Sequence, residues 1–172
     1  MRGSAPSFGI TTAITVQAFP APASATVFQY VWNMQPSDAV NAVLAFQQFA
    51  ETNIPSEYGS EFVIGRGNAA GELYFGLTGG WYGPADQFSA VIAPFLAQVP
   101  QPNSQTLTPG TYINSVQYLG GLGTLSTSAP DSTDTFYAKS LMTPAASPIS
   151  SAALTAFMNY MANEGSQSSL VR

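Results

Sequence analysis

The chain has 172 residues, of which 45% are hydrophobic, 12% aromatic and only 8% charged. This length suits one domain with a real core, and so apolar a composition excludes intrinsic disorder. Four basic residues against nine acidic ones cannot neutralise a row of phosphates, which excludes a nucleic-acid-binding function.

Four strands are predicted in the first half of the chain, where apolar and polar residues alternate or aromatic and β-branched residues gather. They are expected at residues 10–18, 26–32, 61–66 and 72–78. On the second of these strands, Phe28, Tyr30 and Trp32 share one face. The last two strands are joined by Gly65-Arg66-Gly67-Asn68, which is typical of a hairpin turn.

Two helices are predicted between and after these strands. Pro36-Ser37-Asp38 opens the first helix, which is expected to continue to about Thr52. Pro84 suits the first position of the second helix, because proline is tolerated where the backbone N–H has no helical partner. The second helix has one apolar stripe, formed by Phe88, Val91, Ile92, Phe95 and Leu96.

The second half of the chain begins with weaker patterns. Residues 100–109 are predicted to be a polar connector, residues 111–119 could be a short helix or irregular, and residues 120–132 are expected to form an exposed loop. A strand is expected at residues 135–142. A final helix follows, with Ser147 and Pro148 as its N-cap and first-turn pair and with an apolar stripe formed by Leu154, Phe157, Met158 and Met161.

This order of elements predicts an α+β fold, in which one antiparallel sheet is covered by three helices on one face. The other face of the sheet is expected to be apolar and aromatic. Exposed rings would favour a homo-oligomer, since large apolar patches usually find a partner and few charges oppose contact. The rings expected to be exposed are Phe28, Tyr30, Trp32, Tyr74 and Tyr137.

The sequence lacks two residue types that carry much of enzyme chemistry. Without cysteine, no disulfide, catalytic thiol or zinc–thiolate site can form within the chain. Without histidine, the commonest general base and metal ligand is missing. Glu57 and Glu61 could form a pair of catalytic carboxylates, but two acidic residues around the start of a strand are more often surface groups.

Three segments share a pattern with one enzyme family. The first segment is Phe136-Tyr137-Ala138-Lys139-Ser140-Leu141, which is followed by Thr143-Pro144 and an amphipathic helix. The second is Arg2-Gly3 with Phe8-Gly9-Ile10 after it. The third is Phe19-Pro20-Ala21-Pro22, at the end of the first predicted strand. Together these segments resemble the substrate domain, and the segment leading into it, of the berberine-bridge-enzyme-like FAD-linked oxidases, which include fungal oligosaccharide oxidases. The resemblance covers essentially the whole chain but only part of such an oxidase.

The resemblance implies three parts of the chain. Residues 1–20 correspond to the segment and strand that close the FAD domain, residues 21–165 to a truncated substrate domain, and residues 166–172 to a flexible tail. In the family, FAD is held by an N-terminal domain, often covalently through histidine and cysteine, and this chain has neither residue. We therefore expect the chain alone to bind no FAD and to have no oxidase activity.

The resemblance also implies one substrate-binding residue. Residues 113–120 are similar to the family segment that supplies an aromatic ring to the sugar-binding cleft, and Tyr118 occupies the position of that ring. Its face could stack on a pyranose while its hydroxyl hydrogen-bonds. Alternatively, Tyr118 is a buried tyrosine that anchors a loop. Val63 stands where the family's oligosaccharide oxidases carry an acidic group, which departs from their pattern of sugar recognition.

Two functional hypotheses follow. The chain is either a truncated substrate-domain portion of an FAD-dependent oligosaccharide or alcohol oxidoreductase, or a stand-alone carbohydrate-binding or bioactive protein that kept the fold and lost the chemistry. The resemblance implies an oligosaccharide as a partner, and the sequence does not identify the ligand of the stand-alone protein. No run of about 18 apolar residues predicts a membrane span. No signal peptide is predicted, although full-length relatives are usually secreted.

Overall fold

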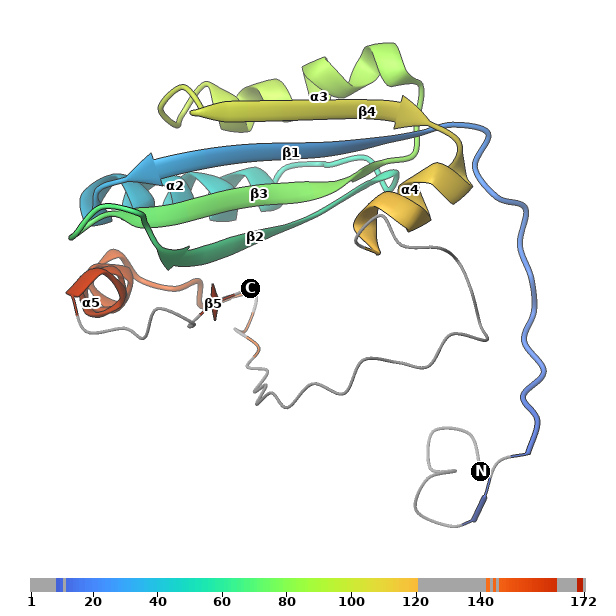
Figure 1. The fold of residues 1–172 in the computed structure, drawn as a ribbon, viewed down its shortest axis with the longest axis horizontal. Coiled ribbons are helices and arrows are strands. Elements are labelled where there is room, and N and C mark those ends of the chain that lie inside the picture. The colour runs from blue at the N-terminus through green and yellow to red at the C-terminus, as the bar shows by residue number, and fades with distance from the viewer. Residues whose placement is uncertain are drawn as a thin grey trace.

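The structure is a computed structural model that describes residues 9–10, 12–120, 142, 144, 146–163 and 170–171. Its strands form one antiparallel sheet in the order β4-β1-β3-β2-β5 (Figure 1). The elements are β1 (Ala25–Met34), α2 (Pro36–Ala50), β2 (Tyr58–Arg66), β3 (Leu73–Trp81), the 3₁₀ helix η1 (Ala85–Gln87), α3 (Phe88–Leu96), β4 (Ser104–Gly110), α4 (Tyr112–Leu119), α5 (Ser151–Asn163) and β5 (Leu170–Val171).

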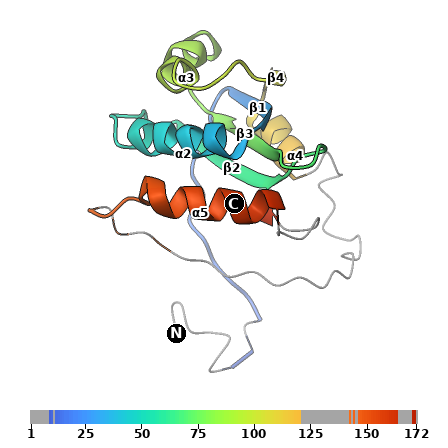
Figure 2. The ribbon, with the colours of Figure 1, turned by 90° about the vertical axis from the view of Figure 1, so that its left-hand side faces the viewer.

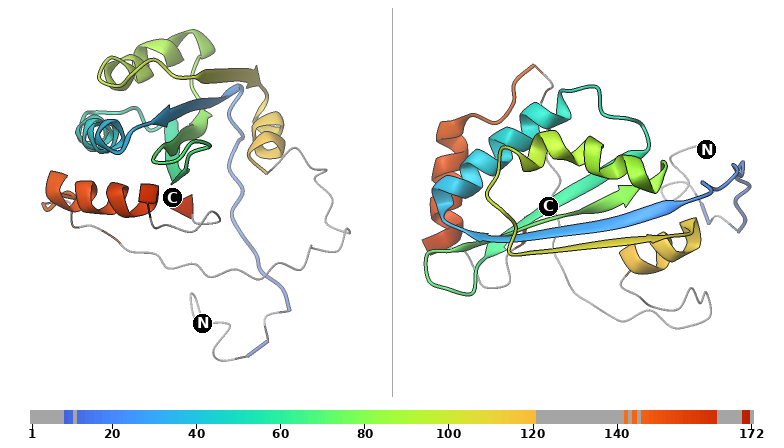
Figure 3. Two further views of the ribbon diagram at one scale, coloured as in Figure 1. Left: turned by 60° about the vertical axis from the view of Figure 1, so that its left-hand side comes forward. Right: turned by 90° about the horizontal axis from the view of Figure 1, so that it is seen from above.

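The helices α2, α3 and α5 lie side by side on one face of the sheet, as Figures 2 and 3 show. The helix α4 lies on the opposite face, at the end of the sheet where β4 ends (Figure 3). The α+β fold with a helical layer on one face is therefore confirmed. The predicted strands at 26–32, 61–66 and 72–78 and the first two helices are also confirmed, each with boundaries that differ by a few residues.

The aromatic face of β1 packs under the helices. Phe28, Tyr30 and Trp32 are 0%, 3% and 2% exposed, so the prediction that they lie on an exposed face is wrong. The cause is strand alternation, which puts these rings on the side where the apolar stripes of α2 and α3 meet the sheet. Phe28 stacks on Phe88 at a centroid distance of 4.7 Å, and Trp32 donates from Nε1 to the Pro100 carbonyl at 2.7 Å.

The opposite face of the sheet, which we call the open face, mixes apolar and polar residues. Val27 and Val31 of β1 and Val63 of β2 lie on it beside the polar residues named next. In the strand register, Gln29 of β1 pairs with Thr78 of β3, and Thr78 pairs with Glu61 of β2. The next open-face position on β3 is Gly76, and the half-buried ring of Tyr74 lies over it. Tyr74 is thus an open-face aromatic residue, as expected, whereas Tyr137 lies outside the described residues.

The N-terminal arm, residues 12–24, contains no helix or strand. In Figure 1 it runs away from the sheet. The predicted strand at residues 10–18 is wrong, because no described strand lies beside it to pair with its backbone. Its apolar side chains are strongly exposed: Ile14 by 79%, Val16 by 78% and Phe19 by 78%; Ile10, just before the arm, is 93% exposed.

Residues 100–109 do not form the predicted polar connector, because β4 pairs with β1 from Ala25↔Gly110 to Val31↔Ser104. The ambiguous segment after it is the helix α4, which starts at a capping box between Thr111 and Asn114. The predicted strand at residues 135–142 falls outside the described residues except for Met142, which belongs to no element. The predicted loop at residues 120–132 also falls outside, beyond Gly120.

The helix α5 has the expected apolar stripe, with Leu154, Met158 and Met161 buried. Its first turn is capped by Ser150, whose Oγ accepts a hydrogen bond from the Ala153 N–H at 3.3 Å. The predicted cap at Ser147 is therefore wrong by three positions in the chain, since the helix begins only at Ser151. The Gln47 amide of α2 donates to the Ile149 carbonyl at 3.2 Å and accepts from the Ile149 N–H at 2.8 Å, which docks the start of α5 on α2.

Within the described ranges, no helix is both long and apolar enough to cross a membrane.

Candidate functional site

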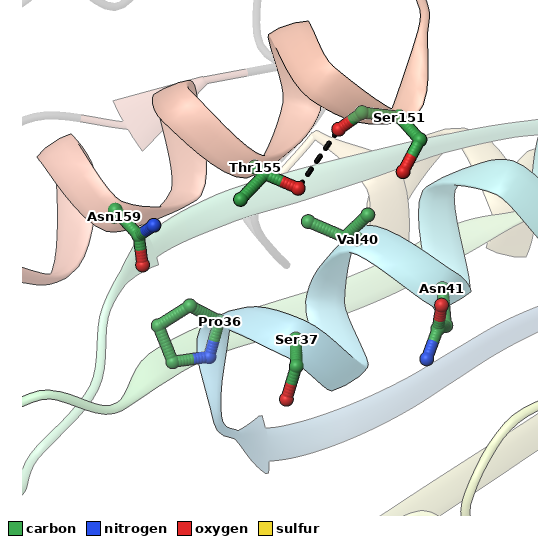
Figure 4. Close-up of a pocket in the computed structure, with 7 residues that line it drawn as sticks. All are labelled: Pro36, Ser37, Val40, Asn41, Ser151, Thr155 and Asn159. Carbon is green, nitrogen blue, oxygen red and sulfur yellow. Dashed lines mark hydrogen bonds between the residues drawn. The ribbon is translucent and has the colours of Figure 1, made fainter.

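Two depressions in the described part of the surface differ in chemistry. The first is a groove of about 340 Å³ between α2 and α5 (Figure 4). Its lining residues are Pro36, Ser37, Val40, Asn41, Ser151, Thr155 and Asn159. None of them is charged or aromatic, and Thr155 Oγ already donates to the Ser151 carbonyl at 2.8 Å. The groove offers neither acid–base groups nor a stacking ring.

The second depression, the open-face pocket, lies where β2 starts and β3 ends. It measures about 430 Å³. Its lining residues are Gly59, Ser60, Glu61, Thr78, Gly79, Gly80, Tyr82 and Leu119. A β-carbon on Gly59 would meet nothing within 4 Å, so a ligand can approach the backbone of β2 closely at this position. Leu119 comes from the last turn of α4, so the pocket is bounded by the sheet and by the one helix on the open face.

Two partly exposed tyrosine rings lie together beside the pocket. The ring of Tyr82 covers Gly80, with its Cζ 3.0 Å from the place where a β-carbon on Gly80 would stand. It lies 6.0 Å from the ring of Tyr112 between centroids, tilted by 51°. Tyr112 is 37% exposed, and Tyr82 is half-buried. Such rings offer apolar faces for stacking and hydroxyl groups for hydrogen bonding.

Glu61 is the charged side chain of the pocket. Its carboxylate is exposed and takes part in no hydrogen bond or ion pair with the described residues. Thr78 lies directly opposite on β3, and its Oγ donates to the Phe28 carbonyl at 3.2 Å. The Thr78 hydroxyl hydrogen is thus used in a hydrogen bond to β1, and the hydroxyl oxygen can only accept a hydrogen bond from a ligand.

The Glu57 carboxylate lies near the same end of β2, outside the pocket lining. It accepts from Ser56 Oγ at 3.2 Å, and the Glu57 backbone carbonyl accepts from the Tyr82 N–H at 2.9 Å. The backbone bond fixes Tyr82 directly after β3. Among the described residues, no group of three or more acidic side chains is placed to hold a metal ion.

The predicted site residue Tyr118 lies on α4, half-buried, and follows the buried Ser115 by three residues. It is not among the residues that line the open-face pocket, although its neighbour Leu119 is. Its stacking role stays a prediction. Val63, which replaces an acidic residue in the resemblance, lies on the open face two residues after Glu61.

Sequence reasoning missed most of this site. From the sequence, Glu61 is more simply a surface group, Gly79-Gly80-Trp81-Tyr82-Gly83 is more simply a strand-to-helix turn than a phosphate loop, and Tyr112 gives no signal. The signal that could have found them is the string Gly79-Gly80-Trp81-Tyr82, in which glycines at the end of a strand precede an aromatic residue. Interpreting it would have required the register of β2 against β3.

No protein-family model matches the sequence. The chain is 31% identical over 99 residues to an FAD-linked oxidoreductase, dpmaF, of Metarhizium anisopliae, covering 58% of the chain and 18% of that protein. It is 24% identical over 172 residues to a chitooligosaccharide oxidase of Gibberella zeae, covering 98% of the chain and 33% of that protein. The chain thus spans a third or less of the length of these relatives.

Among solved structures, the glucooligosaccharide oxidase of Acremonium strictum superposes with a TM-score of 0.68 at 25% identity, over 90% of this chain and 30% of that one. That enzyme is described as carrying a 6-S-cysteinyl, 8α-N1-histidyl FAD. These comparisons confirm the resemblance found in the sequence and the fold of a substrate domain. This chain has no cysteine and no histidine, so its own residues do not fit that mode of flavin attachment.

Proposed function

Since the homologues of this chain are FAD-linked carbohydrate oxidoreductases, we propose that it is the oligosaccharide-binding portion of such an enzyme. Residues 21–165 would form the truncated substrate domain, residues 1–20 the segment that closes the FAD domain, and residues 166–172 a tail. The observation that carries the proposal is the open-face pocket, where the open backbone at Gly59, a carboxylate without a partner among the described residues and two tyrosine rings lie together.

The pocket suits a pyranose for three physical reasons. The ring faces of Tyr82 and Tyr112 can pack on the apolar C–H face of a sugar. The Glu61 carboxylate can accept hydrogen bonds from sugar hydroxyl groups. The backbone at Gly59 carries no side chain that would hold the sugar away, and a β-carbon there would meet nothing within 4 Å.

Redox chemistry is the part of the function that we assign to residues outside this chain. Flavin supplies hydride transfer in FAD-linked oxidases. Because the chain lacks cysteine and histidine, we propose that it binds sugar without oxidising it, and we derive no step through FAD. A purified chain would then be colourless, and a flavin absorption band that persists through gel filtration would contradict this.

A second candidate is a stand-alone carbohydrate-binding or bioactive interaction protein with the same fold. The observation in its favour is that the groups offered for sugar binding, the Glu61 carboxylate and the Tyr82 ring, can bind a sugar without a flavin. Transcript context separates the two. A reading frame that continues upstream into an FAD-binding segment favours the oxidoreductase, and a transcript with its own promoter at Met1 favours the binding protein.

The experiment that tests the proposal is calorimetric titration of the chain with cello- and chito-oligosaccharides. Tyr82→Ala should weaken binding by about 1 kcal/mol, as expected for a lost aromatic contact. Tyr160→Ala, which removes a 54% exposed ring on the helical face, is the matched control and should leave binding unchanged. If the parent chain binds neither sugar series, the carbohydrate proposal is wrong.

The same titration tests Tyr118. If its ring stacks on sugar, Tyr118→Ala should weaken binding by about 1 kcal/mol with little loss of stability. If the ring is a buried anchor, the substitution should instead cost about 3 kcal/mol of unfolding free energy and act on binding only through folding. Thermal melting of Tyr118→Ala beside Tyr118→Phe distinguishes the loss of the ring from the loss of the hydroxyl group.

A further inference from the structure

The open-face pocket is rich in hydrogen-bond acceptors and poor in positive charge. Glu61 contributes two carboxylate oxygens that no described residue occupies. Thr78 contributes an oxygen whose hydrogen is already donated to the Phe28 carbonyl at 3.2 Å. These two side chains face each other across the β2–β3 register, so their oxygens converge on the same part of the pocket.

The charges around the pocket have one sign. Glu57 lies four residues before Glu61 near the same end of β2 and adds a second carboxylate. The basic residue of β2, Arg66, is five positions after Glu61, about 17 Å along an extended strand. Its guanidinium donates to the Ala162 carbonyl at 3.4 Å, on the side of the sheet covered by α5. Among the described residues, no cation reaches the pocket to neutralise Glu61.

A ligand group that only donates hydrogen bonds and carries positive charge complements such a pocket. An ammonium group has three donors and a positive charge, so its hydrogen bond to a carboxylate is charge-assisted, whereas a hydroxyl group or an acetamido N–H donates one neutral hydrogen bond. We therefore propose that the pocket selects amino sugars, and that Glu61 and Thr78 bind the ammonium group of a glucosamine unit while Tyr82 packs beside its ring. This inference rests on the proposed carbohydrate-binding function and names the substrate class of that site.

The test is calorimetric titration of the full chain with three tetrasaccharides of glucosamine, N-acetylglucosamine and glucose, at a pH where the amines are protonated. The glucosamine tetramer should bind about threefold to fivefold more tightly than the neutral ones, the size expected of an exposed charge pair. Added salt should reduce this preference and leave the affinity for the neutral tetramers unchanged.

Two variants assign the preference to the pocket. Glu61→Gln keeps the size of the side chain and should make the affinities for the three tetramers equal. Thr78→Val should reduce the affinity for the glucosamine tetramer alone. Glu51→Gln is the control, because it removes the same charge from the exposed end of α2 in the helical layer and should keep the preference. Thermal melting confirms that each variant is folded.

The outcomes separate the two proposals. Equal affinities of the parent chain for all three tetramers overturn the amino-sugar inference and leave carbohydrate binding intact. A preference that survives in Glu61→Gln, or that disappears equally in Glu51→Gln, also overturns it, because net charge would then explain the effect. Failure to bind any tetramer overturns the carbohydrate function together with the inference.

Discussion

Tyr58, at the start of β2, combines a packed ring with a hydroxyl group that is poorly hydrogen-bonded. The ring stacks on Phe28 at 5.5 Å and meets Phe49 edge-on at 5.7 Å. The hydroxyl oxygen is buried, with no hydrogen bond of good geometry to the described residues. Burial raises the pKa of Tyr58 to about 12, and the nearby Ser60 side chain lowers it by a smaller amount.

This pKa predicts how stability depends on alkaline pH. An unfolded tyrosine ionises near pH 10.0, whereas folded Tyr58 keeps its proton to about pH 12. Its contribution to stability is therefore complete below pH 10.0 and is lost as the pH rises through about 12. Tyr58→Phe should flatten this part of the curve of unfolding free energy against pH. The curve will keep some slope, because burial also raises the pKa of Tyr30.

Urea unfolding at neutral and alkaline pH checks the prediction. At neutral pH, Tyr58→Phe should be at least as stable as the parent, since a buried hydroxyl without a partner costs about 1–3 kcal/mol. Tyr160→Phe, at an exposed position of α5, is the control for removing a tyrosine hydroxyl. A loss of stability in Tyr58→Phe at neutral pH would show that the hydroxyl has a favourable partner in solution.

At the scale of elements, β2 and β3 approach each other through glycines. A β-carbon on Gly79 would lie 2.1 Å from the Gly59 carbonyl oxygen and 2.7 Å from Cζ of Phe28. The first obstacle is backbone and the second is a fully buried ring, so neither can move away without disturbing the sheet.

Gly79→Ala should therefore lower the unfolding free energy by about 2–3 kcal/mol, the usual cost of overpacking. Gly59→Ala is the matched control on the neighbouring strand, because a β-carbon there would meet nothing within 4 Å. Its effect should stay within about 0.5 kcal/mol. Chemical denaturation of both variants measures the difference, and equal losses would contradict the assigned contact.

Elements whose own side chains carry a clear period could be predicted from the sequence. The stripes Phe88-Ile92-Phe95 and Leu154-Met158-Met161 identify α3 and α5 without knowledge of their partners. The strand β4 could not be predicted in this way, because its Ser, Gln and Thr residues and Pro109 form a polar pattern that is typical of a connecting loop. Such residues are compatible with an edge strand, which needs only β1 beside it.

The candidate site was harder to predict than the fold. Glu61, Tyr82 and Tyr112 are separated in sequence and meet only through the β2–β3 register and the position of α4 on the open face. The predicted strand at residues 10–18 is wrong for a related reason. Alternation of apolar and polar residues shows that a segment is compatible with a strand, but a strand forms only where a second strand lies beside it.

At the scale of the whole molecule, the sequence predicted a homo-oligomer from exposed aromatic rings. Three of those rings, Phe28, Tyr30 and Trp32, are buried, so they do not support it. Exposed apolar side chains occur instead along the N-terminal arm, where Ile14 and Val16 are 79% and 78% exposed. Self-association of this chain stays a prediction, now with the arm as the contact surface.

Light scattering over a dilution series tests this contact. The parent chain should have a mass above that of a monomer, and the double substitution Ile14→Ser with Val16→Ser should shift it towards the monomer. The control substitutes two polar residues of the same arm, Thr12→Ser with Gln17→Ser, and should leave the mass unchanged. A parent chain that is monomeric throughout the series would rule out the oligomer.

The position of β1 affects how the chain can fold as it leaves the ribosome. β1 lies between β3 and β4, and both of these partner strands are translated after it. Until they emerge, neither edge of β1 has the partner strand that it has in the folded sheet. Pairings between segments far apart in sequence also form slowly. We therefore expect β1 to stay incompletely paired, and open to association with other chains, until residues up to Gly110 have been synthesised.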